Sequence, residues 1–302
     1  MVSIHSQIRS NIAKSYAFMA GFVVFVVFAG YVMGNALGYG NSWMGIAVLF
    51  SIGSSFISYY WGDSLVLAMS GARPADRKRD FDFFTVTENL CIATGLPKPR
   101  LYVIEDTAMN AFATGRDPQH AVICVTTGIV DRLERRELEG VIAHELSHVK
   151  NYDIRLMAIV AVLAGTVAFL ADMFMRSLWW GGGRRSRDND RGGDLQGILM
   201  IVGIVLAILS PFIASMIQFA ISRKREFLAD ASAALITRYP EGLARALEKL
   251  KGDKEVLEAA TNATAHLFIA NPFKGKQFHA WFSGLFDTHP PIDERIKALR
   301  AM

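Results

Sequence analysis

The amino-acid sequence predicts a mainly α integral membrane protein, with about four transmembrane helices and a soluble α+β domain that is split along the chain. Of the 302 residues, 52% are hydrophobic and only 20% are charged, whereas about 25% of residues in average soluble domains are charged. No charged residue occurs between Lys14 and Asp63, and this interval can hold two spanning helices of roughly 20 apolar residues each. Two blocks of more polar sequence follow this interval and predict the soluble part.

Residues 1–62 are predicted to form a transmembrane hairpin with spans at about 16–36 and 43–62. Arg9 and Lys14 precede the hairpin, the sequence between its spans carries no charge, and a basic cluster follows it. That cluster consists of Arg73, Arg77, Lys78 and Arg79. Positive residues collect on the cytoplasmic side of membrane helices, so both outer flanks are expected in the cytoplasm. The first apolar run is longer than that of a typical signal peptide and is interpreted as a retained span.

Residues 63–155 are predicted to form the first part of the soluble domain. A helical pattern over 82–96 ends in a Gly-Leu-Pro stop signal. Two β-rich runs, 100–106 and 121–130, are separated by polar sequence and predict short strands. A further helix is expected to begin around Glu134.

Residues 156–221 are predicted to hold the third and fourth membrane segments, at 156–171 and 195–221. Between them lies an Arg/Gly-rich loop, 181–194, with four arginines. The positive-inside rule disfavours an external position for this loop. Either the first hairpin dominates the topology, or the last two segments are partly re-entrant, and the sequence leaves both possibilities open.

Residues 222–302 are predicted to complete the soluble domain in three helices, near 222–236, 241–270 and 291–301. Cys91 and Cys124 have no metal-ligand spacing and are expected to be buried apolar residues. The net charge of +4 is attributed to the basic flanks of the membrane segments, so no nucleic-acid partner is expected.

The chemistry of the chain centres on the motif His144-Glu145-Leu146-Ser147-His148. Residues four apart lie on one face of a helix, where two imidazoles can share one tetrahedral Zn²⁺ ion. Glu145 is adjacent to the first histidine and is predicted to act as a general base on the hydrolytic water.

A catalytic zinc site needs a third protein ligand. A third histidine in the extended H-E-x-x-H-x-x-G-x-x-H pattern is excluded, because Asn151 and Ile154 occupy its glycine and histidine positions. A later helical run, FAISRKREFLADASAALI, offers Glu226 and Asp230 four residues apart. The spacing suggests Glu226 as the third ligand and Asp230 as the acceptor for an N–H group of a ligand imidazole.

The H-E-x-x-H motif, the run SRKREFLADASAA about 80 residues later, the four-span layout and DTHPPIDERI near the C-terminus resemble the HtpX family of membrane-bound zinc metalloendopeptidases. These are relatives of the CaaX prenyl-protein endopeptidases. The resemblance implies a zincin-like (gluzincin) protease domain with one Zn²⁺ per chain and Glu226 as third ligand. It also implies a multi-pass protein of the bacterial inner membrane, whose catalytic domain faces the cytoplasm. Its substrates would be misfolded or damaged membrane proteins and unfolded proteins, cleaved in quality control and the stress response.

Two further sites are expected on weaker grounds. Asn110, Ala111 and Phe112 would bind the substrate backbone by strand addition, as in similar zinc proteases, or would form an ordinary turn with a buried Phe112. His289 would stabilise the oxyanion of the scissile carbonyl, or would belong to a turn before the last helix.

Two other functions were weighed against the peptidase. A zinc-stabilised scaffold would need a closed site of four protein ligands, which neither cysteine is spaced to complete. A transporter or channel would need ionisable residues within the spans, and the first two spans have none. A zinc-dependent endopeptidase is therefore predicted, and the oligomeric state is left open.

Overall fold

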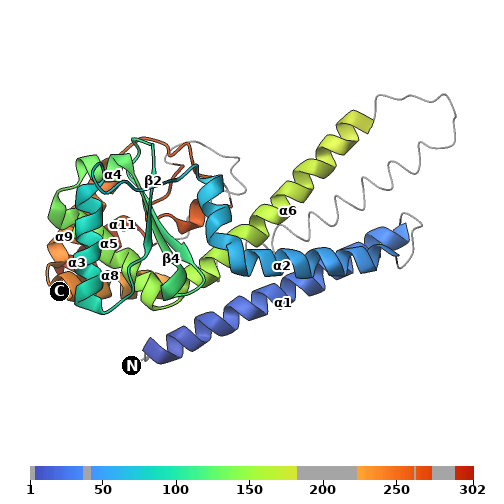
Figure 1. Cartoon of the computed structure of the whole chain (residues 1–302), viewed down its shortest axis with the longest axis horizontal. Coiled ribbons are helices and arrows are strands. Elements are labelled where there is room, and N and C mark those ends of the chain that lie inside the picture. Colours follow the sequence, from blue (N-terminus) through green and yellow to red (C-terminus); the bar gives the residue numbers. More distant parts are fainter. Residues whose placement is uncertain (1–3, 37–41, 182–222, 262, 274–289) are drawn as a thin grey trace.

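Three long helices project from one side of an α+β unit (Figure 1). They are α1 (Ile4–Ala36), α2 (Ser42–Met69) and α6 (Asp153–Gly181). The structure is a computed structural model that describes residues 4–36, 42–181, 223–261, 263–273 and 290–302. The predicted fourth span, 195–221, and the loop after Gly181 therefore lie outside the described residues.

The helices α1 and α2 carry the charge-free sequence and expose it. The segments Ile8–Phe28 and Met44–Met69 are long and apolar enough to cross a membrane. Large apolar side chains on them face outward, and Val24 and Leu49 are 70% and 76% exposed. An apolar surface of this extent needs a nonaqueous neighbour, and lipid is the neighbour that two helices of this length fit.

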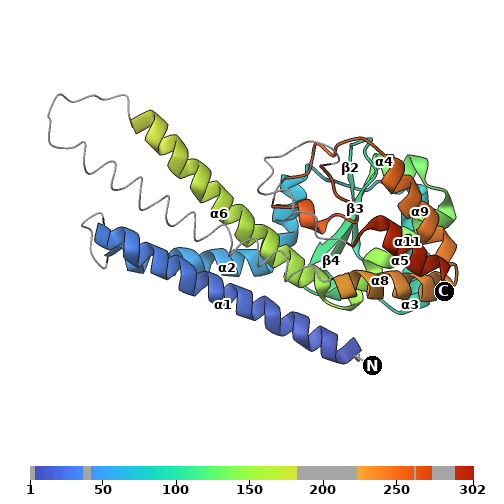
Figure 2. The same ribbon diagram turned by 180° about the vertical axis from the view of Figure 1, so that it is seen from behind.

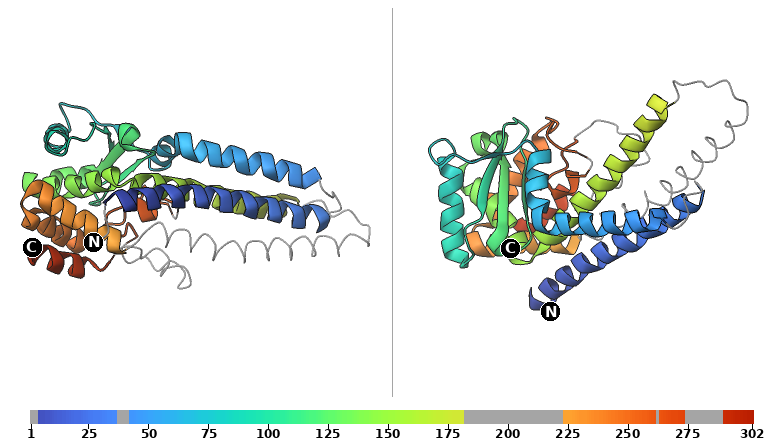
Figure 3. Two further views of the ribbon diagram at one scale, coloured as in Figure 1. Left: turned by 90° about the horizontal axis from the view of Figure 1, so that it is seen from below. Right: turned by 45° about the vertical axis from the view of Figure 1, so that its right-hand side comes forward.

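The helix α6 packs against both α1 and α2, and all three run away from the α+β unit in one direction (Figures 2 and 3). Both α1 and α2 extend beyond the predicted spans. The first begins well before residue 16 and the second continues to Met69. The residues beyond the predicted spans reach the α+β unit, because Asn11 bonds to Asn151, and Val66 and Leu67 are buried in its apolar core. The hairpin is therefore continuous with the fold rather than a separate anchor.

The sheet has four strands in the order β1-β2-β4-β3. Their bounds are β1 (Arg73–Pro74), β2 (Arg100–Ile104), β3 (Ala111–Gly115) and β4 (Ala121–Thr126). The β2–β4 pair is parallel, and the β1–β2 and β3–β4 pairs are antiparallel. The strand β3 is therefore an edge strand of the sheet, and it contacts both α5 and α6.

The two predicted β-rich runs form β2 and β4, but the details of the second differ. The prediction extended it to residue 130, whereas β4 ends at Thr126 and α4 (Thr127–Arg132) follows. The hydroxyl of Thr126 accepts a hydrogen bond from the N–H group of Ile129 at 3.3 Å, and this N-cap begins the helix. The strand β3 falls in sequence taken as a connection, because alanine and glycine have low β-propensity. Burial of all five of its residues outweighs that propensity.

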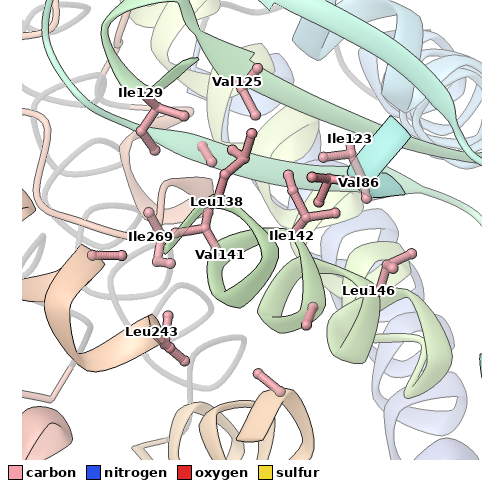
Figure 4. Close-up of a cluster of buried hydrophobic side chains, with 14 of the residues drawn as sticks. Val86, Ile123, Val125, Ile129, Leu138, Val141, Ile142, Leu146, Leu243 and Ile269 are labelled. Atoms are coloured by element: carbon pink, nitrogen blue, oxygen red, sulfur yellow. The ribbon is translucent and has the colours of Figure 1, made fainter. Parts of the chain in front are cut away.

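The helix α5 (Arg135–Lys150) occupies the centre of the α+β unit. Glu134 and Glu137 form a capping box at its start, which explains the predicted onset near Glu134. Apolar side chains of α5, among them Leu138 and Ile142, point toward the sheet, and Leu243 approaches from α9 on another side (Figure 4). Every residue from Leu138 to Val149 except one is buried, so the motif-bearing helix is enclosed on nearly all faces.

The helices α3 (Phe81–Thr94), α8 (Arg223–Thr237), α9 (Pro240–Gly252) and α11 (Ile292–Arg300) enclose α5 and one another. Three of the predicted helices match α3, α8 and α11 to within about two residues. The predicted helix over 241–270 is wrong beyond Gly252, and a short 3₁₀ turn, Ala265–Leu267, follows instead.

The side chain of Asp253 explains why α9 ends. Its carboxylate accepts hydrogen bonds from the backbone N–H groups of Met109, at 2.8 Å, and of Glu255, at 3.2 Å. These bonds tie the chain to the start of β3 and form a local turn that competes with helix.

The crossing of α5 and α9 requires glycine at Gly140. A methyl group there would lie 2.6 Å from the backbone nitrogen of Leu243, well inside contact distance. Gly140→Ala should therefore lower the free energy of unfolding by about 1–3 kcal/mol, measured by thermal or denaturant unfolding of the solubilised chain. Gly252→Ala, at a position with nothing within 4 Å, is the control. Equal melting temperatures in the two variants would contradict the close approach.

Candidate metal centre

The structure brings His144 and His148 of α5 together with Glu226 of α8. The Nε2 atoms of the two histidines lie 3.2 Å apart. The Glu226 oxygens lie 3.7 Å from His144 Nε2 and 3.6 Å from His148 Nε2. All three side chains are buried, and their ligand atoms lie within 4.8 Å of one another. Sequence spacing suggested this set, and the packing of α8 on α5 assembles it.

The spacing of these atoms fits a tetrahedral metal ion. Nitrogen ligands about 2.0–2.1 Å from such an ion lie about 3.3 Å apart, close to the observed separation of the two Nε2 atoms. One Glu226 oxygen lies near each of the two Nε2 atoms, at 3.7 and 3.6 Å, slightly farther than this ligand-to-ligand distance. The donor set, two imidazoles and a carboxylate, is one that zinc prefers in catalytic sites.

Carboxylates on the far side of each ring reinforce this arrangement. His144 Nδ1 lies 2.9 Å from Asp230 Oδ1, and His148 Nδ1 lies 3.0 Å from Asp153 Oδ2. An Nδ1–H group donating to each carboxylate leaves the Nε2 lone pair of each ring directed at the shared point. In that tautomer neither ring can donate to the other, so a cation is the partner that satisfies both lone pairs.

The charges around the two rings also favour a cation. Burial lowers the pKa of His144 to about 4. Burial acts in the same sense on His148, but the hydrogen bond to Asp153 and the carboxylates of Glu226 and Glu145 outweigh it and raise the pKa of His148 to about 9. Without a metal the pair thus holds one positive charge near neutral pH, in the place that a bound ion would take.

Glu145 lies beside the ligands in the same buried region. Burial is the main cause that raises its pKa, to about 7, and Glu226 adds to the rise. The His148 and Arg295 side chains act in the opposite sense, as does the backbone amide of Ala113 in β3, which hydrogen-bonds to the carboxylate. A carboxyl group with a pKa near neutrality can both accept and return a proton.

Sequence reasoning missed Arg295, which is fully buried in the site. Its Nε and Nη2 atoms donate to the two oxygens of Asp230 at 2.8 and 2.7 Å, and Nη1 lies 3.8 Å from Glu226 Oε2. With these partners the pKa of Asp230 is about 2, because Arg295 outweighs the effect of burial. A signal was present: Arg295 follows Ile292 by three residues and precedes Leu299 by four, on the apolar face of α11.

Asp153 was also missed. It lies five residues after His148, beyond the end of the motif helix, and no spacing rule connects the two. Its position depends on the turn between α5 and α6.

The residues expected to bind substrate are engaged within the chain. The side-chain amide of Asn110 donates to the carbonyl of Ala270 at 2.9 Å, and the carbonyl of Ala111 accepts from the amide of Ile269 at 2.9 Å. Phe112 is completely buried against Phe268. The segment after α9 therefore covers the start of β3, whereas Ala113, in the middle of the strand, adjoins Glu145. His289 lies outside the described residues.

The model of Peptidase family M48 matches residues 78–302. A protein named "Protease HtpX homolog" from Caldanaerobacter subterraneus subsp. tengcongensis is 43% identical over 293 residues, which are 97% of this chain and 95% of that protein. The homolog from Ligilactobacillus salivarius is 43% identical over 305 residues, covering 99% and 100% of the two chains. The crystal structure of S. mikatae Ste24p aligns with 96% of this chain and 65% of its own, at 18% identity and a TM-score of 0.48. The chain is thus a member of the M48 peptidases and, within them, of the HtpX family.

Proposed function

We propose that this protein is a membrane-bound, zinc-dependent endopeptidase whose metal ligands are His144, His148 and Glu226. The observation that carries the proposal is the convergence of these three buried side chains on one point, with Glu145 beside it. Among the residues described here the cluster has three protein ligands, the number typical of catalytic zinc sites, whereas structural sites have four. Family membership supports hydrolysis over the scaffold and transport alternatives.

Each residue has a distinct part in the reaction. When bound, zinc supplies a Lewis acid that polarises the scissile carbonyl and makes water more acidic. Glu145 accepts a proton from the attacking water at its carboxylate. It then delivers that proton to the amide nitrogen as the C–N bond breaks, so that a carboxylic acid and an amine leave. Asp230 and Asp153 hold the Nδ1–H groups of the two histidines, and Arg295 holds Asp230.

The substrate chain would pair with β3 by strand addition. In the register with β4, residues 110, 112 and 114 direct their backbone groups to β4, and residues 111, 113 and 115 direct theirs outward. Asn110 and Ala111 anchor the segment after α9, and Phe112 supports it. The outward carbonyl of Ala113, whose amide bonds to Glu145, and the outward groups of Gly115 would then be the place for a substrate backbone. His289 stays a candidate for stabilising the oxyanion.

The chain would cross the bacterial inner membrane four times, with the protease domain in the cytoplasm. The basic residues on both flanks of the first hairpin support this orientation. The packing of α6 along α1 and α2 supports α6 as the third span. The domain would be split by the last two spans into 63–155 and 222–302, which the contacts of α8 and α9 with α5 join.

Misfolded or damaged membrane proteins would be the substrates, in quality control and the stress response. In strand addition the affinity comes from main-chain hydrogen bonds, which every extended segment can make, so unfolded segments of many sequences would fit the edge of β3.

Glu145→Gln should abolish peptide hydrolysis while the chain keeps its metal. Glutamine preserves the size of the side chain but cannot accept a proton, and general acid–base catalysis contributes about 10²–10⁴-fold. Cleavage of a model membrane substrate and metal analysis of the same sample test this. Activity above about a tenth of wild type, with zinc retained, would identify another residue as the base. Loss of zinc would instead show that Glu145 supports the metal site.

Glu226→Ala should remove metal and activity together, as should His144→Ala and His148→Ala. The loss of affinity should exceed the roughly 10–100-fold typical for residues that only support a ligand. Metal content per chain is the measurement. Glu258→Ala removes an exposed acid and should keep both. Full zinc content in the Glu226→Ala variant would show that Glu226 is not a metal ligand.

A reporter inserted in the 184–194 loop should give the signal of the non-cytoplasmic side. Reporters placed after Asp63 and at Met302 should give the cytoplasmic signal. The reason is the charge distribution around the first hairpin together with the uncharged length of 195–221. A cytoplasmic signal from the loop would mean that the last two segments do not cross, and the four-span topology would be wrong.

A further inference from the structure

The metal-bearing helix α5 passes into the membrane helix α6 through a turn of two residues, Asn151 and Tyr152. Asp153, the first residue of α6, is buried, and its Oδ2 atom accepts the Nδ1–H group of His148 at 3.0 Å. The orientation of His148 therefore depends on how Asp153 itself is held. A carboxylate bound through one oxygen alone can rotate, so the partners of Oδ1 decide whether Oδ2 faces the ring.

The Oδ1 atom of Asp153 has two donors from distant parts of the chain. Asn11 of α1 donates from Nδ2 at 2.7 Å, and Arg225 of α8 donates from Nη1 at 3.1 Å. Asn11 precedes Asp153 by more than 140 residues and is 2% exposed. Asn11, on the first membrane helix, is thus a buried polar residue that reaches the metal ligand His148 through one intervening residue, Asp153.

The side-chain amide of Asn11 is used at both ends. Its Nδ2 group donates to Asp153 and also to the carbonyl of Asn151 at 3.0 Å, in the turn after α5. Its Oδ1 atom accepts from Arg225 Nη1 at 3.2 Å. The Nδ2 group faces two acceptors and the Oδ1 atom faces a guanidinium. These contacts fix the orientation of the side-chain amide. A residue that merely filled space at this helix contact would need none of these bonds.

We propose that Asn11 is a positioning residue for the metal centre, acting on His148 through Asp153. It fixes the rotation of the Asp153 carboxylate and ties the turn that connects α5 to α6. Without it, the one remaining donor to Oδ1 among the residues that the structure describes would be the guanidinium of Arg225, which would itself have lost the Asn11 oxygen. The hydrogen bond to His148 would then be less well aligned, and the ring would hold the metal less tightly.

The competing explanation is that Asn11 only anchors α1 to the protease domain. Loss of an anchor lowers the melting temperature of the metal-free and metal-loaded chain alike. Loss of a positioning residue increases the rate at which the folded protein releases its metal and changes the absorption spectrum of a Co²⁺-substituted centre, because the geometry of the ligands changes. These two readouts separate the explanations.

The experiment uses the full chain, solubilised and loaded with zinc or Co²⁺, in three variants. Asn11→Ala removes all the bonds. Asn11→Asp keeps the size and the interaction with Arg225 but removes the donor to Asp153, and it carries the test if the alanine variant does not fold. Ser15→Ala is the matched control, because Ser15 is buried one turn further along α1 and its hydroxyl donates to the backbone carbonyl of Asn11.

Zinc release to a chromophoric chelator should be about tenfold faster in both Asn11 variants, the lower end of the range for groups that support a ligand. The Co²⁺ spectrum should change in the same two variants. Ser15→Ala should match wild type in both measurements. The inference is overturned if the Asn11 variants release zinc at the wild-type rate, whatever their melting temperatures, or if Ser15→Ala accelerates release as much.

This inference rests on the proposed metal site, and the two fail differently. If the wild-type chain binds no metal, or if His148→Ala retains it, the proposed site is wrong and the role of Asn11 falls with it. If wild type binds metal, His148→Ala loses it and the Asn11 variants behave as wild type, the site stands and only the positioning role is wrong.

Discussion

The structure depends on one requirement: two imidazole nitrogens must be held 3.2 Å apart in a buried site, with their lone pairs facing the same point. In water this arrangement would be unfavourable, and inside a protein it persists only when each ring is fixed from behind. Asp230 and Asp153 supply that constraint on the two sides. They come from α8 and from the start of α6, so the site needs elements that lie more than 70 residues apart in the sequence.

Each supporting carboxylate is in turn held by an arginine. Arg295 binds Asp230 through two hydrogen bonds, and Arg225 binds Asp153. A buried carboxylate without a partner would be neutralised or would destabilise the fold. Pairing with Arg295 lowers the pKa of Asp230 to about 2 and keeps it ionised, and both carboxyl groups accept an imidazole N–H group. Glu226 and Glu145 lie beside the two histidines, where a bound cation would interact with both carboxyl groups.

The parts of the site that the sequence predicted are those controlled by helix geometry. His144 and His148 share a face because they are four residues apart, and the same spacing puts Glu226 and Asp230 together on α8. The parts it did not predict depend on docking between distant elements. Arg295 lies on the apolar face of α11 but its spacing names no partner, and Asn11 belongs to the polar beginning of a predicted span, so their roles become visible only when α11 and α1 are packed.

The same contrast explains the errors in secondary structure. The helices α3, α8 and α11 follow local pattern and were predicted to within about two residues, whereas the two helices of the first hairpin extend beyond the predicted spans. The strand β3 is built from residues of low strand propensity, and it forms because its neighbours bury it. The helix expected to continue to residue 270 stops at Gly252, because Asp253 bonds to Met109 at the start of β3, a partner more than 140 residues away. Long-range hydrogen bonds of this kind leave no periodic trace in the sequence.

The turn between α5 and α6 has a mechanical consequence. Tyr152 adopts a left-handed backbone with φ of 59°, a conformation that costs a residue other than glycine about 1–2 kcal/mol. The guanidinium of Arg155 stacks over its ring at 5.1 Å. A flexible hinge would avoid such a cost, so this turn is a rigid connection between α5, which carries the two histidine ligands, and α6. In a chain inserted as proposed, the metal site would therefore lie at a fixed height above the lipid surface. An extended polypeptide that leaves the bilayer spans about 3.3 Å per residue. Only peptide bonds within a limited number of residues of the membrane surface would therefore reach the metal site without further unfolding.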